Sequence, residues 1–209
     1  MTAAGLIDEP LDREAAILDA ALVVLARHGI GGVTMRAVAH AAGVSLGLAN
    51  YYFTDKTSLI SAALRRIGEQ DLDIVRADGG TPADRLRRAL RRVGDDELIR
   101  PQYMALRLQL WSLATVDRAF SEINRSAQRR YLDKLADLIA AAMPDLDHDE
   151  VARRAGDILV VQNGIWLTAA LIDDREALDR SIERCEKIAF ATTTSIARRH
   201  TRPTVSSAR

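Results

Sequence analysis

The chain has 209 residues, of which 48% are hydrophobic, and its 29 basic and 29 acidic side chains leave no formal net charge at pH 7. This length allows one large domain or two small ones, with a sizeable core in either case. The neutral balance excludes an argument for nucleic-acid binding from bulk charge, because only a strongly basic chain supports that argument by itself.

Composition also bears on the compartment in which the protein works. The N-terminal segment MTAAGLIDEPLDRE is acidic and lacks the apolar stretch of a secretory signal peptide. No uninterrupted apolar run approaches the roughly 20 residues of a membrane span. The single cysteine, Cys185, cannot form an internal disulfide and favours a reducing compartment. We therefore expect a soluble, cytoplasmic protein that has no membrane partner.

Apolar residues recur at helical spacing along almost the whole chain, and strand signals are nearly absent. The first helix is expected from Arg13 to His28, with one apolar face that includes His28 and an end at the glycines of GIGG. Thr34, Ser45 and Thr54 are placed to cap the next three helices. These are expected over residues 35–41, 46–53 and 55–75.

Further helices follow at similar spacing. Thr81, Pro82 and Asp84 form a helix start, and Asp147 with Glu150 resembles a capping box. One helix is expected to begin at residue 82. Four more are expected over about 103–115, 117–143, 147–172 and 175–200. The sequence thus predicts an all-α fold of about nine helices. It divides into a small N-terminal bundle over residues 1–60, a longer-helix domain over 61–200 and a disordered tail over 201–209.

The stretch RAVAHAAGVSLGLANYYFTDK, residues 36–56, has the features of a helix-turn-helix unit. Alanines make its first helix narrow, so that the second helix can cross it closely. Gly43 permits a turn that a Cβ would resist, and Val44 can plug that turn into the core. Ala49 and Phe53 can face inward while Leu46, Gly47, Leu48, Asn50 and Tyr51 face outward. A glycine in so short a helix is better explained by close approach to another surface than by stability.

Over about residues 13–65 the chain resembles the tetracycline-repressor (TetR) family of transcriptional regulators. The family pattern appears as Thr34, Arg36, Ala42-Gly43-Val44-Ser45, Gly47, Tyr52-Phe53, Lys56 and Leu59. The chain departs from it at Asn50, where many members carry tyrosine. The segment GLANYYFTDK is most similar to the choline-responsive repressors of betaine pathways. The resemblance implies an N-terminal helix-turn-helix DNA-binding domain and a C-terminal domain for ligand binding and dimerisation.

The resemblance also implies roles for individual residues on double-stranded operator DNA. Thr34, Tyr52 and Lys56 would contact phosphates and fix the register. Arg36 and Asn50 would face base edges, where arginine pairs with guanine and asparagine with adenine. The remaining expected DNA-binding residues are Ser45, Leu46, Gly47, Leu48 and Tyr51; the two leucines suit thymine methyl groups, and Tyr51 suits a phosphate or a base. The alternative makes the tyrosines core aromatics and Arg36 a solvated surface charge.

Other chemistry-bearing side chains indicate no catalytic or metal site. The run DRLRRALRRV, residues 84–93, is interpreted as a solvated arginine stripe, with a supplementary DNA contact as the alternative. The four histidines are scattered without metal-ligand spacing. Cys185 is expected to be an inert packed thiol. We expect no catalytic residues, no metal and no cofactor.

The C-terminal helices indicate a homodimer. Apolar residues circle the segment ILVVQNGIWLTAALI, residues 158–172, which is typical of a helix buried on more than one side. The last helix adds Ile182, Cys185, Ile188, Ala189, Thr192 and Ile196 at helical spacing. Helices over about 150–172 and 175–199 are therefore predicted to form a four-helix interface about a two-fold axis.

Two helices of the C-terminal part carry a candidate small-molecule pocket. Amides and aromatic side chains interrupt apolar stretches on two helices, as in a mixed pocket lining. The candidate ligand-binding residues are Tyr103, Met104, Gln109, Trp111, Gln162, Asn163 and Trp166. The alternative is that the tryptophans are ordinary core residues and that neighbouring helices satisfy the amides. An aromatic cage around a quaternary ammonium group would have two tryptophans and one tyrosine of this set to draw on.

The combined hypothesis is a ligand-responsive, DNA-binding transcriptional regulator, expected to be a repressor. An unknown effector would release it from a pseudo-palindromic operator by favouring a state in which the two DNA-binding heads are wrongly spaced. Two alternatives stay open at this point. One is a small helical enzyme or carrier whose hairpin is structural, and the other is a regulator without an effector.

Overall fold

The computed structural model describes residues 10–172 and 174–192, and within these ranges the chain forms nine α-helices and no strands. The helices are α1 (Pro10–Gly32), α2 (Met35–Ala41), α3 (Leu46–Tyr52), α4 (Lys56–Ile74), α5 (Pro82–Arg92), α6 (Pro101–Val116), α7 (Arg118–Ala142), α8 (His148–Leu171) and α9 (Arg175–Ala189). The all-α prediction is confirmed.

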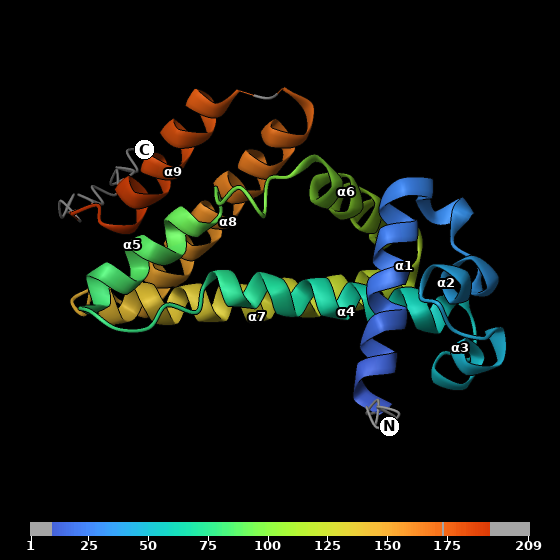
Figure 1. The fold of residues 1–209 in the computed structure, drawn as a ribbon. Coiled ribbons are helices and arrows are strands. Elements are labelled where there is room, and N and C mark those ends of the chain that lie inside the picture. Colours follow the sequence, from blue (N-terminus) through green and yellow to red (C-terminus); the bar gives the residue numbers. More distant parts are fainter. Residues whose placement is uncertain (1–9, 173, 193–209) are drawn as a thin grey trace, which may run out of the picture.

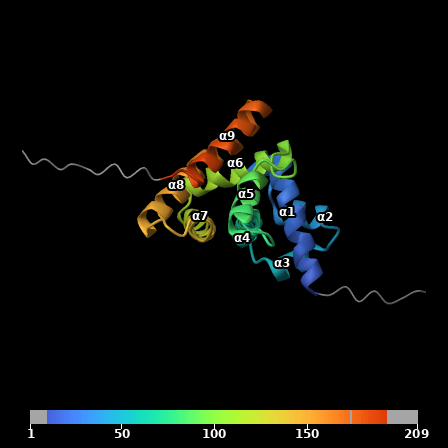
Figure 2. The same cartoon turned by 90° about the vertical axis from the view of Figure 1, so that its left-hand side faces the viewer.

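Two long helices, α4 and α7, pack along each other and connect the two ends of the molecule (Figure 1). The short helices α2 and α3 lie with α1 at one end, whereas α5, α8 and α9 lie at the other. Helix α6 packs against α1, α7 and α8. In the turned view, α1 and α8 lie on opposite sides of α4 (Figure 2). Helices α4 and α7 are therefore the elements through which the two ends can influence each other.

Side-chain caps form at four of the expected helix starts, those of Thr34, Ser45, Thr81 and Asp147. The hydroxyls of Thr34 and Ser45 each accept a hydrogen bond from the backbone N–H three residues ahead, at 3.1 Å. Thr81 and Asp84 form a full capping box at the start of α5. Each such cap satisfies a backbone donor that the helix leaves open. These starts were predictable because the cap and its partner lie within one turn of each other.

The expected starts of other helices differ from the structure by a few residues or by the residue that caps them. Asp55, not Thr54, caps α4: its carboxylate accepts a hydrogen bond from the Ser58 N–H at 2.7 Å, and the Ser58 hydroxyl accepts one from the Asp55 N–H. Pro101 begins α6 instead of preceding it, since the first helical turn needs no N–H at that position. Asp147 caps α8, but the carboxylate of Glu150 pairs with arginines and does not complete a capping box.

The two outer helices also differ from expectation. Regular α1 geometry breaks at Gly29, whose φ of 67° favours glycine, and a last helical turn then reaches Gly32. His28 is exposed and does not belong to the apolar face of α1. Helix α9 ends at Ala189, well before His200. The rest of the expected last helix from residue 193 and the tail over 201–209 lie outside the described residues.

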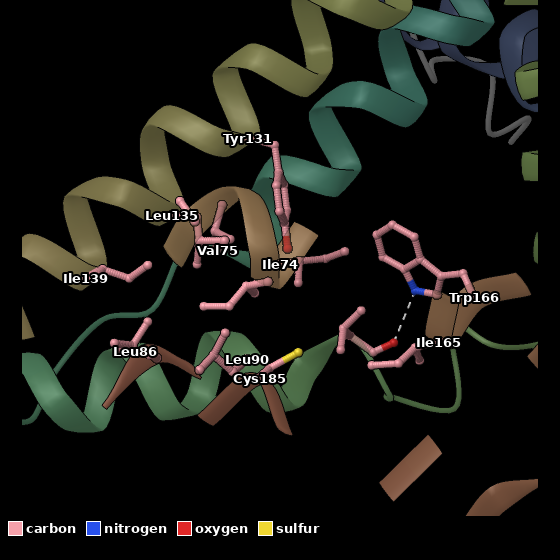
Figure 3. Close-up of a cluster of buried hydrophobic side chains, with 14 of the residues drawn as sticks. Ile74, Val75, Leu86, Leu90, Tyr131, Leu135, Ile139, Ile165, Trp166 and Cys185 are labelled. Atoms are coloured by element: carbon pink, nitrogen blue, oxygen red, sulfur yellow. Dashed lines mark hydrogen bonds between the residues drawn. The ribbon is translucent and has the colours of Figure 1, made fainter. Parts of the chain in front are cut away.

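Two hydrophobic clusters form the core, and α4 contributes to both. Its first half, including Leu59 and Leu64, packs with α1, α2 and parts of α6. Its last turn, including Leu72 and Ile74, packs with α5, α7, α8 and α9 (Figure 3). The head of the molecule, by which we mean α1, α2, α3 and the first half of α4, thus has its own core.

Helix α1 has the length and composition of a membrane-spanning helix over Arg13–Gly32. Its inward face, with Ile17, Ala21 and Leu25, is nevertheless buried against the other helices of the head. Buried apolar side chains on one face are what a core helix of a folded domain requires. The apolar character of α1 is therefore accounted for by the head's core.

Candidate functional site

The hairpin of α2 and α3 is assembled around small buried side chains. Ala39 and Ala49 are almost completely buried where the two helices pack against each other. Phe53 closes α3 and inserts into the core of the head, and Val44 packs against that core from the turn. Gly43 has a φ of 67° between the helices, which a residue with a Cβ adopts only with strain. The sequence thus fixes α3 rigidly through its inner face.

The outer face of α3 carries the residues that were expected to contact DNA. Gly47 and Asn50 are exposed, and Tyr51 is 79% exposed, although large aromatic side chains are usually buried. Leu46 is also exposed, while Leu48 is half-buried. Among the described atoms, a Cβ at Gly47 would meet only the Ser45 hydroxyl, at 3.9 Å. This face is free to approach another surface closely.

The residues expected on phosphates, together with the expected DNA contact Ser45, flank this face and also have structural roles. Thr34 and Ser45 are exposed, and their hydroxyls are the caps of α2 and α3. Tyr52 is half-buried, and its ring meets Tyr51 edge to face with centroids 5.3 Å apart. The Lys56 ammonium donates a hydrogen bond to the Ile30 carbonyl at 2.5 Å and so ties α4 to the end of α1.

Arg36 lies on α2, beside the hairpin, and is exposed. An exposed guanidinium has the reach and the donors for a base edge or a phosphate. It therefore stays in the candidate DNA-binding set together with the outer face of α3.

The second candidate site centres on Arg107 of α6, which the sequence analysis missed. Its guanidinium is only 2% exposed and forms two hydrogen bonds to the carboxylate of Asp71 on α4, one of them 3.0 Å long. It also donates to the Tyr103 hydroxyl at 3.1 Å. Removing one partner of such a buried pair typically costs about 3–5 kcal/mol, because the other charge stays buried. The pair therefore holds α4 to α6.

Three of the expected ligand residues surround this guanidinium. Its central carbon lies 3.8 Å from the ring centroid of Trp166, and 5.2 Å and 5.7 Å from those of Tyr103 and Trp111. These are cation–π distances. The Trp166 indole N–H donates to the Val93 carbonyl at 3.2 Å, which holds that ring in place (Figure 3). An aromatic cage is thus present, and it encloses the protein's own cation.

The electrostatics agree with a charged, locked pair. Burial acts to lower the pKa of Arg107, but the Asp71 carboxylate raises it, and the net shift is upward. Burial also raises the pKa of the Tyr103 hydroxyl, which therefore stays protonated at neutral pH. Burial raises the pKa of the Cys185 thiol to about 12, as expected for an inert packed cysteine.

The other expected ligand residues do not join this cluster. Met104 is buried in the core of the C-terminal part. Gln109 lies near Gly29 at the break in α1. Gln162 accepts a hydrogen bond from the Tyr131 hydroxyl at 2.9 Å. Among the described residues, the Gln162 amide nitrogen and the side-chain oxygen of Asn163 have no hydrogen-bond partner.

A narrow slot opens beside the ion pair, between α4, α6 and α7. Its cavity volume is about 20 Å³, which is room for about one water molecule. Asp71, Arg107 and Trp111 line it together with the amides of Asn124 and Gln128. Of the seven expected ligand residues, only Trp111 lines this slot. The amides of α7 carried no sequence signal that separates them from ordinary surface polar residues.

The arginines of α5 are not a merely solvated stripe. Arg88 donates to the Asp78 carbonyl at 2.7 Å, and Arg92 donates to the Arg76 carbonyl at 2.9 Å. Arg91 forms an ion pair with Glu186 of α9. These contacts tie α5 to the end of α4 and to α9, at the end of the molecule far from α3 (Figure 1). That position does not favour a supplementary DNA contact.

One face of α8 stays apolar and is not covered by the described residues. Val160 is 72% exposed, and Leu167 and Leu171 are exposed along the same side. Among the described atoms, nothing lies within contact distance of a Cβ built at Gly156 or Gly164, which share that side. By contrast, the apolar side chains of α9 pack into the core of their own protomer, namely Leu178, Ile182, Cys185, Ile188 and Ala189. Thr192 is exposed, and Ile196 lies outside the described residues.

Within residues 10–172 and 174–192, no group of three or more histidine, cysteine, aspartate or glutamate side chains is arranged to hold a metal ion.

Comparisons with known proteins match both the N-terminal and the C-terminal part of the chain. Residues 17–63 match the model of bacterial regulatory proteins of the tetR family, and residues 82–191 match that of the C-terminal domain of BetI-type transcriptional repressors. The chain is 27% identical over 177 residues to the transcriptional regulator BetI of Stenotrophomonas maltophilia, covering 83% of this chain and 88% of that protein. It is 29% identical to BetI of Burkholderia ambifaria, covering 79% and 88%.

Solved structures share the fold. A putative transcriptional regulator from Pseudomonas aeruginosa superposes with a TM-score of 0.75 at 23% identity, covering 86% of this chain and 89% of that one. A TetR regulator from Haloarcula marismortui gives the same TM-score and identity, covering 86% and 97%. The multidrug-binding protein EbrR, solved with malachite green, has a TM-score of 0.63 at 23% identity, covering 85% and 98%.

Proposed function

The chain belongs to the TetR family of bacterial regulatory proteins and has a C-terminal domain of the BetI repressor type, and we propose that it is a cytoplasmic, dimeric repressor released from its operator by a small molecule. The observation that carries DNA binding is the outer face of α3. A rigid inner face holds this helix, while Asn50 and Tyr51 are exposed beside a glycine that permits close approach.

In this proposal some residues contact DNA phosphates and others contact base edges. Thr34, Ser45, Tyr52 and Lys56 lie on phosphates, and Lys56 keeps further N–H donors besides the one that binds Ile30. Arg36, Asn50 and Tyr51, with Leu46, Gly47 and Leu48, face the bases. The first group provides affinity on any sequence and the second provides preference among sequences.

Dimerisation is proposed to occur through the uncovered face of α8. An exposed apolar stripe of this length is uncommon on a monomer and is self-complementary across a two-fold axis. Val160, Leu167 and Leu171 would meet their equivalents on a second copy, with the exposed, charged side of α9 at the rim. Two symmetric heads then require a pseudo-palindromic operator.

The dimer is tested by size-exclusion chromatography with light scattering on a Val160→Glu/Leu167→Glu variant. Both positions are exposed, so the protomer should stay folded while the pair of copies separates. Val116→Glu is the matched control, because Val116 is 80% exposed but lies at the end of α6. A double variant that stays dimeric would remove α8 from the interface.

DNA binding is tested by gel shift on the intergenic DNA beside the protein's own gene, with a salt titration. Phosphate contacts predict that log K falls linearly with log salt, with a slope of roughly −0.9 per phosphate neutralised. No binding at any accessible salt concentration, with or without metabolites, would contradict the proposal.

An effector is supported by buried polar atoms of the C-terminal part that lack partners within the described chain, at Arg107, Gln162 and Asn163. Buried polar atoms without partners are uncommon and call for an explanation. EbrR, which has this fold, has been solved with malachite green. A regulator without an effector predicts instead that a metabolite panel neither shifts the melting temperature nor releases DNA.

A further inference from the structure

The head has few cations with which to hold a polyanionic partner. Residues 10–60 contain four lysine or arginine side chains, namely Arg13, Arg27, Arg36 and Lys56. Arg36 and Lys56 already have proposed contacts on the operator. Phosphate contacts supply a large share of the affinity of proteins for DNA. The positions of the two remaining arginines therefore determine how firmly each head can hold the DNA backbone.

Both remaining arginines are exposed on α1, but they border different surfaces. Arg13, near the start of α1, lines an open notch between this helix and the helix-turn-helix hairpin, together with Gly43, Ser45 and Leu48. Arg27 lines a separate groove that α1 forms with α4 and α6. Of the two, Arg13 is thus the one that adjoins α3.

The notch continues the surface that we propose to lie on DNA. Ser45 and Leu48 belong to that surface and also line the notch. The notch has a volume of about 480 Å³, whereas a water molecule takes up roughly 30 Å³, so a phosphate group of a DNA strand can enter it. A duplex seated on α3 therefore brings its backbone to the guanidinium of Arg13.

Arg13 and Lys56 lie at opposite ends of α3. The notch borders the first residues of this helix, whereas Lys56 follows soon after its last residue, Tyr52, and is tied to the Ile30 carbonyl at the far end of α1. Helix α3 is about 10 Å long, which is close to the width of about 12 Å of the major groove. One DNA strand borders that groove on each side, so the two cations can reach different strands.

We propose that Arg13 binds a phosphate of the operator strand opposite the strand bound by Lys56. The inference rests on the proposed function and adds a positioning residue to its DNA-binding surface. A guanidinium suits this place because it carries five N–H donors and binds phosphate through two of them at once, so it can bind DNA and keep a contact within the protein. With a cation on each strand, α3 is held at both of its ends and cannot tilt in the groove.

The first test compares Arg13→Gln with Arg27→Gln in the full-length protein, by titrating operator and random duplexes at several salt concentrations. Arg27→Gln is the matched control because it removes an exposed arginine from the same helix. Arg13→Gln should weaken binding to both duplexes by the same factor, about three- to thirtyfold for a dimer that loses two exposed ion pairs. The slope of log K against log salt should become shallower by roughly 0.9 per head. Arg13→Lys keeps the charge and should restore the slope.

The second test identifies the phosphate by ethylation interference on the operator fragment. Ethylating the phosphate that Arg13 binds should weaken the original protein but not Arg13→Gln, since that variant has already lost the contact. The same experiment with Tyr52→Phe, which keeps the ring and removes the hydroxyl, should lose interference on the other strand. Thermal midpoints of Arg13→Gln and Arg27→Gln should agree, because the proposed role of Arg13 lies on DNA and not in the fold.

Four results would overturn the proposal: an Arg13→Gln variant with the affinity and salt slope of Arg27→Gln, a loss on operator DNA alone, a loss of slope that Arg13→Lys does not restore, or an unchanged ethylation pattern. A loss on operator DNA alone would make Arg13 a base contact. Each of these results requires that the original protein binds its operator. Failure of the original protein to bind would instead contradict the proposed function itself.

Discussion

The two hydrophobic cores of this molecule differ in the polarity of the side chains that they bury. The core of the head contains alanines, leucines, isoleucines, valines and phenylalanines, and Ser61 is the buried polar residue among the described residues of the head. The core of the C-terminal part encloses charged and amide side chains, among them Arg107, Arg154 and Gln162. Both parts are helical and pack through similar long helices.

This difference matches where each part does its chemistry. The head recognises its partner on its surface, so its interior need only be rigid. The C-terminal part is proposed to recognise a small molecule inside, where polar groups provide selectivity but cost stability if they lack partners. The contrast predicts that apolar truncation damages the head most, while paired polar substitutions are tolerated in the other core.

The largest effect is expected from Leu59→Ala. Leu59 is fully buried in the head at the start of α4, so truncation leaves a cavity beside α1. The free energy of unfolding in urea, followed by circular dichroism, should fall by about 2–5 kcal/mol. Val116→Ala, at an 80% exposed position, should change it by less than about 0.5 kcal/mol. A Leu59 variant as stable as the Val116 variant would mean that the head is loosely packed.

The polar core is examined with Tyr131 and Gln162, whose hydroxyl and amide oxygen are hydrogen-bonded at 2.9 Å. Gln162→Leu alone leaves the Tyr131 hydroxyl buried without an acceptor and should cost about 1–3 kcal/mol. Tyr131→Phe/Gln162→Leu removes both polar groups and should be close to neutral. A double-mutant cycle in urea measures the coupling. If the double variant is less stable than both single variants, the C-terminal core tolerates the paired loss of polar groups no better than the loss of one. The contrast between the two cores would then fail.

Sequence reasoning located the head well because its rules are local. Thr34 and Ser45 lie three residues from the N–H groups that they cap, and Gly43 lies in the turn that requires its positive φ. Where two cap residues are adjacent, local rules cannot choose between them. The sequence predicts a cap at Thr54, but the capping box of Asp55 with Ser58 decides the start of α4.

Only some residues around Arg107 could be predicted from the sequence, and the reason is physical. Trp111 and Trp166 stand out by residue type, so they were named as candidates. Arg107 looks like any helical arginine until α4 brings Asp71, 36 residues away in sequence, against it. Which face of α6 meets which helix is a property of tertiary packing. Periodicity within one helix cannot supply it.

Asn50→Ala separates base contacts from phosphate contacts on the head. If Asn50 makes a bidentate contact with adenine, its loss should relax the preference at one operator position by about 1–3 kcal/mol. Tyr52→Ala should instead weaken binding to operator and random DNA alike, because a phosphate contact carries no base information. Competition binding with single-base operator variants measures both effects. Equal losses for Asn50→Ala on both kinds of DNA would remove it from the base-reading set.

The smallest effect comes from Ser45, which is both the cap of α3 and a proposed phosphate contact. Ser45→Ala removes the hydroxyl that accepts the Leu48 N–H and should lower the free energy of unfolding by about 1 kcal/mol. Ser45→Asp caps a helix as well as serine does, so its stability should stay near that of the original protein. Its negative charge would nevertheless face a phosphate, so operator affinity should fall more than in Ser45→Ala. The two roles are thus separated by comparing denaturation with operator binding for the same pair of variants. Undiminished operator binding by Ser45→Asp would show that Ser45 serves the rigid inner structure of the head and not its DNA-facing surface.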